Sequence, residues 1–176
     1  MTELVLVRRM KTLTPYTKRR FLREHLRHRL TLLRTLRERT SSGYNFQGKG
    51  DIYRCVKDSN LIAVRLLLDF LGLKGEYHNG RFRLVESPRR KGAKWEDDVK
   101  IDQFIGRLLT PRDVPKNFQR LLAGVYRRAD KELAHLTLRF NKPFNEKKAL
   151  IDSASALEGL FQKFVYAGKP LPAMDA

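Results

Sequence analysis

The stretch from Asn117 to Leu138, NFQRLLAGVYRRADKELAHLTL, decides the fold that the sequence predicts. Its apolar residues recur at helical spacing, which predicts one amphipathic helix. Arg128 and His135 lie seven residues apart; this is two turns of an α-helix, so their side chains are expected on nearly the same face. Together they can hold a phosphate and transfer a proton. A structural interpretation stays open, in which the histidine compensates the helix dipole and the arginines form a solvated face.

The segment from Arg128 to His135, RADKELAH, resembles the R-x(4–6)-H signature of HEPN domains, the small helical domains of many prokaryotic RNases and toxin systems. The resemblance implies a metal-independent endoribonuclease that acts as a dimer and leaves a 2′,3′-cyclic phosphate. It implies His135 as general acid or base and Arg128 as the group that neutralises charge on the phosphate, with Asp130 or Lys131 orienting them. Ala129 stands where the family often has a polar residue. That difference favours the alternative of a non-catalytic RNA-binding or toxin-system partner protein.

The composition predicts an anionic partner. The 176 residues include 37 Lys and Arg against 19 Asp and Glu, a net charge of +18. RNA is the first candidate, followed by an acidic protein such as an antitoxin. The apolar fraction of 41% suits one folded domain over residues 1–176. The single cysteine, Cys55, suits a reducing cytoplasm and is expected to be a small core residue. No apolar run is long enough for a membrane span, so no membrane partner is expected.

The N-terminal part concentrates the basic residues. After a loose arm over residues 1–13, Thr14 and Pro15 predict the start of a helix that continues to about Arg39. Met1 to Ser42 contains twelve Lys or Arg and three Glu, which predicts a polyanion-binding surface; a merely solvated helix, or a structural part of a ribonucleoprotein, is the alternative. The predicted nucleic-acid contacts, here and in a later basic loop, are Lys18, Arg19, Arg20, Arg23, Arg27, Arg34, Arg89, Arg90 and Lys91.

The remaining segments complete an all-α prediction. A second helix is expected from Asp51 to Leu71 and a short third one from Val99 to Leu109. The pair Asn79-Gly80 predicts a hairpin within residues 75–98, which are expected to be an insertion outside the helical body. A last helix from Glu146 to about Tyr166 precedes a flexible tail over residues 167–176. The predicted architecture is a bundle of four main helices and one short helix. No carboxylate or cysteine cluster lies at ligand spacing, so neither a metal nor another cofactor is expected.

Overall fold

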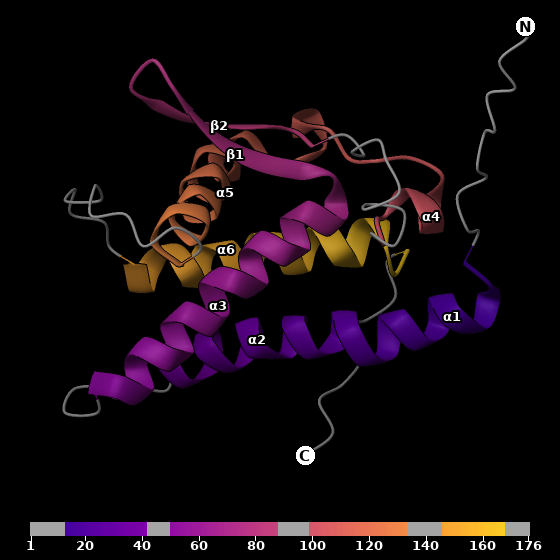
Figure 1. Cartoon of the computed structure of the whole chain (residues 1–176), viewed down its shortest axis with the longest axis horizontal. Helices are drawn as coiled ribbons and strands as arrows, with labels where there is room; N and C mark the ends of the chain where they lie inside the picture. The colour runs from indigo at the N-terminus through magenta and orange to yellow at the C-terminus, as the bar shows by residue number, and fades with distance from the viewer. Residues whose placement is uncertain (1–12, 42–49, 88–98, 134–145, 168–176) are drawn as a thin grey trace, which may run out of the picture.

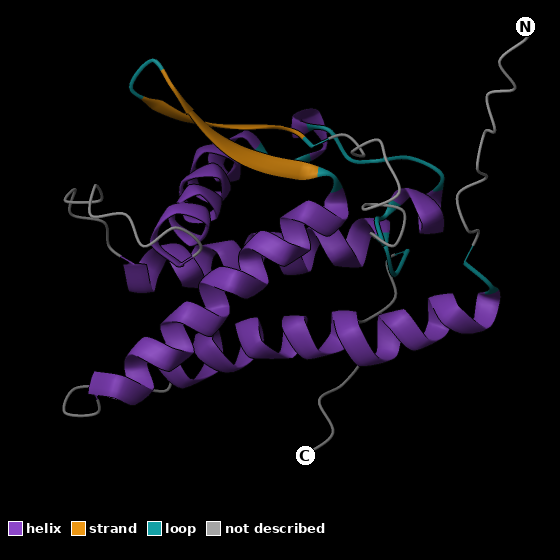
Figure 2. Ribbon diagram, in the orientation of Figure 1, coloured by secondary structure: helices purple, strands orange, loops and turns teal. Residues whose placement is uncertain are grey.

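The computed structural model describes residues 13–41, 50–87, 99–133 and 146–167 (Figure 1). These residues are mainly helical and include one small antiparallel sheet of two strands (Figure 2). The described chain is therefore mainly α, as predicted, although the small sheet means that it is not purely all-α.

A long helix opens the described chain and lies along the bottom of the view in Figure 1. It consists of α1 (Pro15–Arg20), the π-helical segment η1 (Phe21–Leu26) and α2 (Arg27–Ser41). The predicted start is confirmed, because the Thr14 side chain accepts a hydrogen bond of 3.1 Å from the backbone N–H of Thr17. One face of the helix packs on α3 and α6 through buried leucines: Leu26, Leu30, Leu33 and Leu36.

Helix α3 (Gly50–Leu71) confirms the second predicted helix. It ends where Gly72 adopts a φ of +83°, a conformation that side chains disfavour. A Cβ atom at this glycine would also lie only 2.9 Å from the Cβ of Leu108. Much of α3 is buried, but Ile62 and Leu66 keep relative exposures of 45% and 40%. The helix is therefore buried on one side and exposed on the other.

The predicted hairpin is present, but it is not an excursion from the body. Strands β1 (Leu73–His78) and β2 (Arg81–Glu86) pair in antiparallel register. Asn79 and Gly80 join them with φ angles of +48° and +77°, as a primed two-residue turn requires. The hairpin packs across α5 (Figure 1). Because buried side chains of both strands belong to the hydrophobic core, the interpretation of residues 75–98 as an insertion outside the body is wrong for the hairpin.

The region after the hairpin is less helical than predicted. Helix α4 (Asp102–Ile105) replaces the expected helix over residues 99–109, because Gly106 adopts a φ of +81° and ends it. A 3₁₀ turn, η3 (Pro111–Asp113), then leads into α5 (Lys116–Arg128). The π-helical segment η4 (Ala129–Leu133) continues α5, and the last helix is α6 (Glu146–Phe164).

One hydrophobic cluster joins these elements. It contains buried residues of the N-terminal helix, α3, the hairpin, α5 and α6. Phe70 of α3 is buried in this cluster and stacks on Phe161 of α6 and on Phe21, with ring centroids 5.8 Å and 5.6 Å apart. This aromatic contact holds the start of the N-terminal helix against the body, so its basic outer face has a fixed position.

Candidate nucleic-acid interface and motif region

The exposed cations of the N-terminal helix lie near its start. Arg19, Arg20 and Arg23 are all exposed, and the side chains of the last two keep exposures of 59% and 76%. Glu24 lies between Arg20 and Arg23, at 2.8 Å and 3.5 Å from their guanidinium nitrogens. The hydrogen bond from Arg20 lowers the pKa of the Glu24 carboxyl, so this acid is ionised at neutral pH. Three arginines against one glutamate leave this group cationic.

Further along the helix, Arg34 and Arg37 bind Glu158 of α6 instead of facing solvent. The Nε of Arg34 donates to one carboxylate oxygen at 3.0 Å, and Arg37 donates to the other. The side chains of Arg34 and Glu158 are only 17% and 12% exposed. Arg34 therefore ties α2 to α6, and this geometry argues against its predicted role in RNA binding.

The other residues predicted to contact nucleic acid are either partly buried or outside the described part of the chain. Lys18 is partly buried, with its Nζ 5.8 Å from the ring centroid of Phe104. Arg27 is also partly buried. Arg89, Arg90 and Lys91 lie outside the described residues.

The motif region departs from a regular α-helix. Arg128 ends α5, and the next five residues, Ala129–Leu133, form a π-helical turn. A π-helix closes i→i+5 hydrogen bonds and therefore has more residues per turn than an α-helix. The expectation that Arg128 and His135 share one face assumed an unbroken α-helix, and the π-helical turn contradicts this assumption. His135 lies outside the described residues, and its role stays a prediction.

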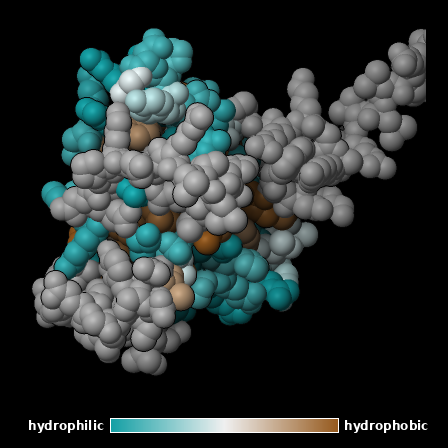
Figure 3. All heavy atoms as spheres, turned by 60° about the vertical axis from the view of Figure 1, so that its left-hand side comes forward, coloured by the Kyte–Doolittle hydropathy of each residue, from teal (hydrophilic) through white to brown (hydrophobic). Residues whose placement is uncertain are grey.

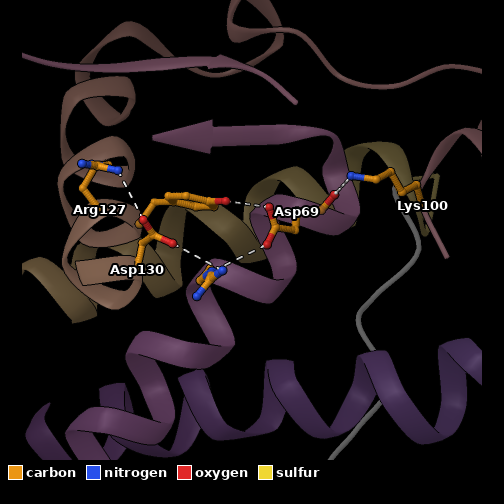
Figure 4. Close-up of polar contacts among 6 residues, drawn as sticks. Asp69, Lys100, Arg127 and Asp130 are labelled. Atoms are coloured by element: carbon orange, nitrogen blue, oxygen red, sulfur yellow. Dashed lines mark hydrogen bonds and ion pairs between the residues drawn. The ribbon is translucent and has the colours of Figure 1, made fainter. Parts of the chain in front are cut away.

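Around this turn, charged side chains of α3 and α5 form a polar cluster (Figure 4). Asp130 lies between two arginines, 3.4 Å from Nη2 of Arg65 and 3.3 Å from Nη1 of Arg127. Arg65 also faces Asp69 at 3.9 Å, and the hydroxyl of Tyr126 donates a 2.8 Å hydrogen bond to that carboxylate. Asp130, proposed as an orienting group, is thus held by two arginines.

Burial and the Asp69 carboxylate raise the pKa of Tyr126 far above its usual range. The phenol therefore stays protonated and remains a hydrogen-bond donor. Lys100 is buried and donates from Nζ to the Asp69 backbone carbonyl at 3.0 Å, which fixes the end of α3. The cluster links α3 to α5 and η4 beside Arg128, which is partly buried, as is Lys131. Its arrangement is that of a structural ion-pair network that places cationic groups next to the motif.

The remaining features of the described surface are its polarity, Cys55 and the grouping of potential metal ligands. In the view of Figure 3 the described surface is mostly hydrophilic, with hydrophobic atoms visible across its middle. Cys55 is exposed, so its assignment to the core is wrong. Over the described ranges, no group of three or more His, Cys, Asp or Glu residues is arranged to hold a metal ion. No helix in the described part of the chain has the length and apolarity that crossing a membrane requires.

Sequence reasoning missed the partners that come from other elements. Arg65 and Asp69 are 61 residues or more from Asp130 and 57 residues or more from Tyr126 in the chain, so no local spacing connects them. In the sequence, Tyr126 is recognisable only as one of the apolar positions between Asn117 and Leu138. A local signal was available at the start of the N-terminal helix. There Arg19 and Arg20 follow the aromatic residue Tyr16 by three and four positions, so the three residues are expected on one side of the helix.

Comparison with known proteins identified no relative of this chain. No protein-family model matches the chain, and neither the search of curated proteins nor that of solved structures found a match.

Proposed function

We propose that this protein binds RNA through the exposed cationic face of its N-terminal helix, on a helical bundle of the HEPN kind. The observation that carries the proposal is the group of three exposed arginines, Arg19, Arg20 and Arg23, which Glu24 neutralises only in part. Phosphates of a nucleic acid supply the matching negative charge and release counterions on binding. The buried leucine face holds the helix to the body, so its cations are presented as a fixed surface.

Charge repulsion and the geometry of arginine both favour a phosphate-bearing ligand on the cationic face of the N-terminal helix. Like charges at helical spacing destabilise a helix, and Glu24 offsets only part of the charge of its neighbours. Arginine suits phosphate because its planar guanidinium can donate two parallel hydrogen bonds. Contacts of this kind read the backbone and not the bases, so little sequence selectivity is expected.

The test is the salt dependence of RNA binding. A variant with Arg19, Arg20 and Arg23 changed to Gln should bind a fluorescent RNA more weakly, and its slope of log affinity against log salt should be shallower by about 2. A matched control changes three other exposed cations, Arg112, Lys116 and Arg120, and so removes the same net charge. Loss of affinity equal to the control's, or binding that does not depend on salt, would contradict the proposal.

A second candidate function is metal-independent cleavage of the bound RNA. The observation that favours it is the position of Arg128, which ends α5 next to the cluster of Arg65 and Arg127. Arginines near a bound phosphate can stabilise the charge that develops during cleavage. In this proposal His135 is the general acid or base, and Lys131 remains a candidate orienting residue.

Cleavage is tested on a fluorescent RNA in the presence of EDTA. His135→Ala should lower the rate by about a hundredfold or more if this residue moves the proton. Arg128→Gln should lower it comparably, while Arg127→Gln controls for general disturbance of the cluster. A DNA copy should stay intact, because the reaction uses the 2′-hydroxyl. If folded His135→Ala cleaves as fast as the parent, the binding-only function, with RNA or an acidic partner protein as ligand, replaces the nuclease.

A further inference from the structure

Tyr16 is the most exposed of the large apolar side chains that the structure describes, with a relative exposure of 73%. The other three such side chains, Tyr77, Ile62 and Leu66, lie between 40% and 50%. An aromatic ring this open adds little to the packing of the body. It therefore offers both ring and hydroxyl to a ligand.

Three exposed arginines follow this ring along the same helix. Arg19 and Arg20 follow Tyr16 by three and four positions within α1, so they share its side of the helix. Arg23 adjoins them, because Glu24 contacts both Arg20 and Arg23. An exposed aromatic ring with arginines beside it is the composition of a surface that stacks a base and holds the neighbouring phosphates.

The segment that carries the ring packs against the body. On the other side of the same segment, Phe21 stacks on Phe70 and lies 5.8 Å from the ring of Phe104. The cap adds a second constraint, since the hydroxyls of Thr14 and Thr17 lie 2.9 Å apart in a hydrogen bond. A platform that is already ordered loses less conformational freedom when a ligand binds.

We propose that the nucleic acid bound by this face is single-stranded, and that one of its bases stacks on Tyr16 while Arg19, Arg20 and Arg23 contact the flanking phosphates. This inference rests on the proposed RNA-binding function and names its substrate class. Unpaired bases offer their faces to an aromatic side chain, whereas bases in a duplex are already stacked on each other. A duplex can use the arginines but not the ring.

The experiment measures binding of one labelled RNA of unstructured sequence, presented as a single strand and as a duplex with its complement. Tyr16→Ala should weaken binding of the single strand by about tenfold, as the loss of one stacked base does. Its salt slope should stay that of the parent, because the phosphate contacts remain. Duplex binding should change little. Tyr16→Phe should restore the affinity, since stacking needs the ring and not the hydroxyl.

Two further measurements make the test specific. Tyr77→Ala removes the other exposed tyrosine of the described residues, at 50% exposure, and should leave both affinities unchanged. Tyr16→Trp should show fluorescence quenching when the single strand binds, measured against the parent, whose single Trp gives the background. A DNA strand of the same sequence distinguishes RNA from single strands in general.

The outcomes separate this inference from the function on which it rests. If Tyr16→Ala binds the single strand as tightly as the parent does, or weakens duplex and single strand equally, stacking is refuted while arginine-dependent RNA binding stands. If the parent binds no RNA even at low salt, both proposals fail together.

Discussion

Asp113 shows how single side chains set the shape of the turn before the motif helix. Its carboxylate accepts hydrogen bonds from the backbone N–H of Thr110 at 2.9 Å and from the Thr110 hydroxyl at 3.2 Å. Arg107 adds two parallel hydrogen bonds, each of 2.8 Å. These donors, Arg107 first, hold the pKa of Asp113 far below its ordinary value. The charged form is therefore favoured in the folded protein.

We expect Asp113→Asn to lower the free energy of unfolding by about 1 kcal/mol at pH 7, a modest value because half of the Arg107 side chain is exposed. A lowered folded-state pKa adds stability above about pH 4, and this stability is lost as the pH falls towards the folded value. Urea denaturation from pH 7 to pH 3 should thus show the difference between parent and variant shrinking in acid. Asp152→Asn, which removes the exposed pair with Lys148, is the control and should cost less than about 0.5 kcal/mol at any pH. A constant Asp113→Asn effect across this pH range would contradict the assignment.

At the level of elements, local sequence signals predicted where helices and the hairpin lie, but not which elements contact one another. Thr14 and Pro15 located the first helix, and Asn79-Gly80 located the hairpin, because caps and primed turns depend on few neighbouring residues. The helix near Gly106 was predicted too long, because the apolar spacing continues past a residue whose conformation ends the helix. The π-helical turns escaped prediction, since apolar spacing does not distinguish them from α-helix. The same holds for the candidate site. The basic helix could be predicted from the sequence, but the contacts of Glu158 and Arg65 could not, because they depend on packing between distant segments.

The contact between the hairpin and α5 depends on Gly75. A Cβ atom there would lie 2.3 Å from the backbone oxygen of Ala123, which cannot move aside as a side chain can. We expect Gly75→Ala to lower the free energy of unfolding by about 1 to 3 kcal/mol. Gly159→Ala, on α6 with open space around it, should instead be neutral or raise stability by up to about 1 kcal/mol. Thermal unfolding of the two variants checks the pair, and equal melting temperatures would refute the close contact.

The joint between α2 and α6 depends on Glu158. Glu158→Gln leaves Arg34 and Arg37 without their shared carboxylate, and we expect a loss of about 2 kcal/mol, as for hydrogen bonds to charged groups. Glu76→Gln removes a more exposed pair with Lys74 and should cost about 0.5 kcal/mol or less. Chemical denaturation of both variants measures the difference. Equal effects would mean that the Glu158 contact does not hold the basic helix in place.

For the whole molecule, the net charge of +18 acts on stability and on binding in opposite ways. Repulsion between like charges destabilises the compact state, and salt screens that repulsion. The same salt weakens association with a polyanion, because counterion release then contributes less. One charge distribution therefore predicts two salt dependences of opposite sign.

We expect the melting temperature of the free protein to rise between about 50 and 200 mM salt, as screening removes self-repulsion. Adding single-stranded RNA at low salt should raise the melting temperature, because a ligand that binds the folded state stabilises it. That RNA-induced increase should shrink over the same range of salt. The variant lacking Arg19, Arg20 and Arg23 should show a smaller increase with RNA and a weaker response of the free protein to salt. Differential scanning fluorimetry measures these melting temperatures for parent and variant, with and without RNA, across the range of salt. An RNA-induced increase that is unaffected by salt would show that the cationic face is not the binding surface, because phosphate contacts cannot be independent of salt.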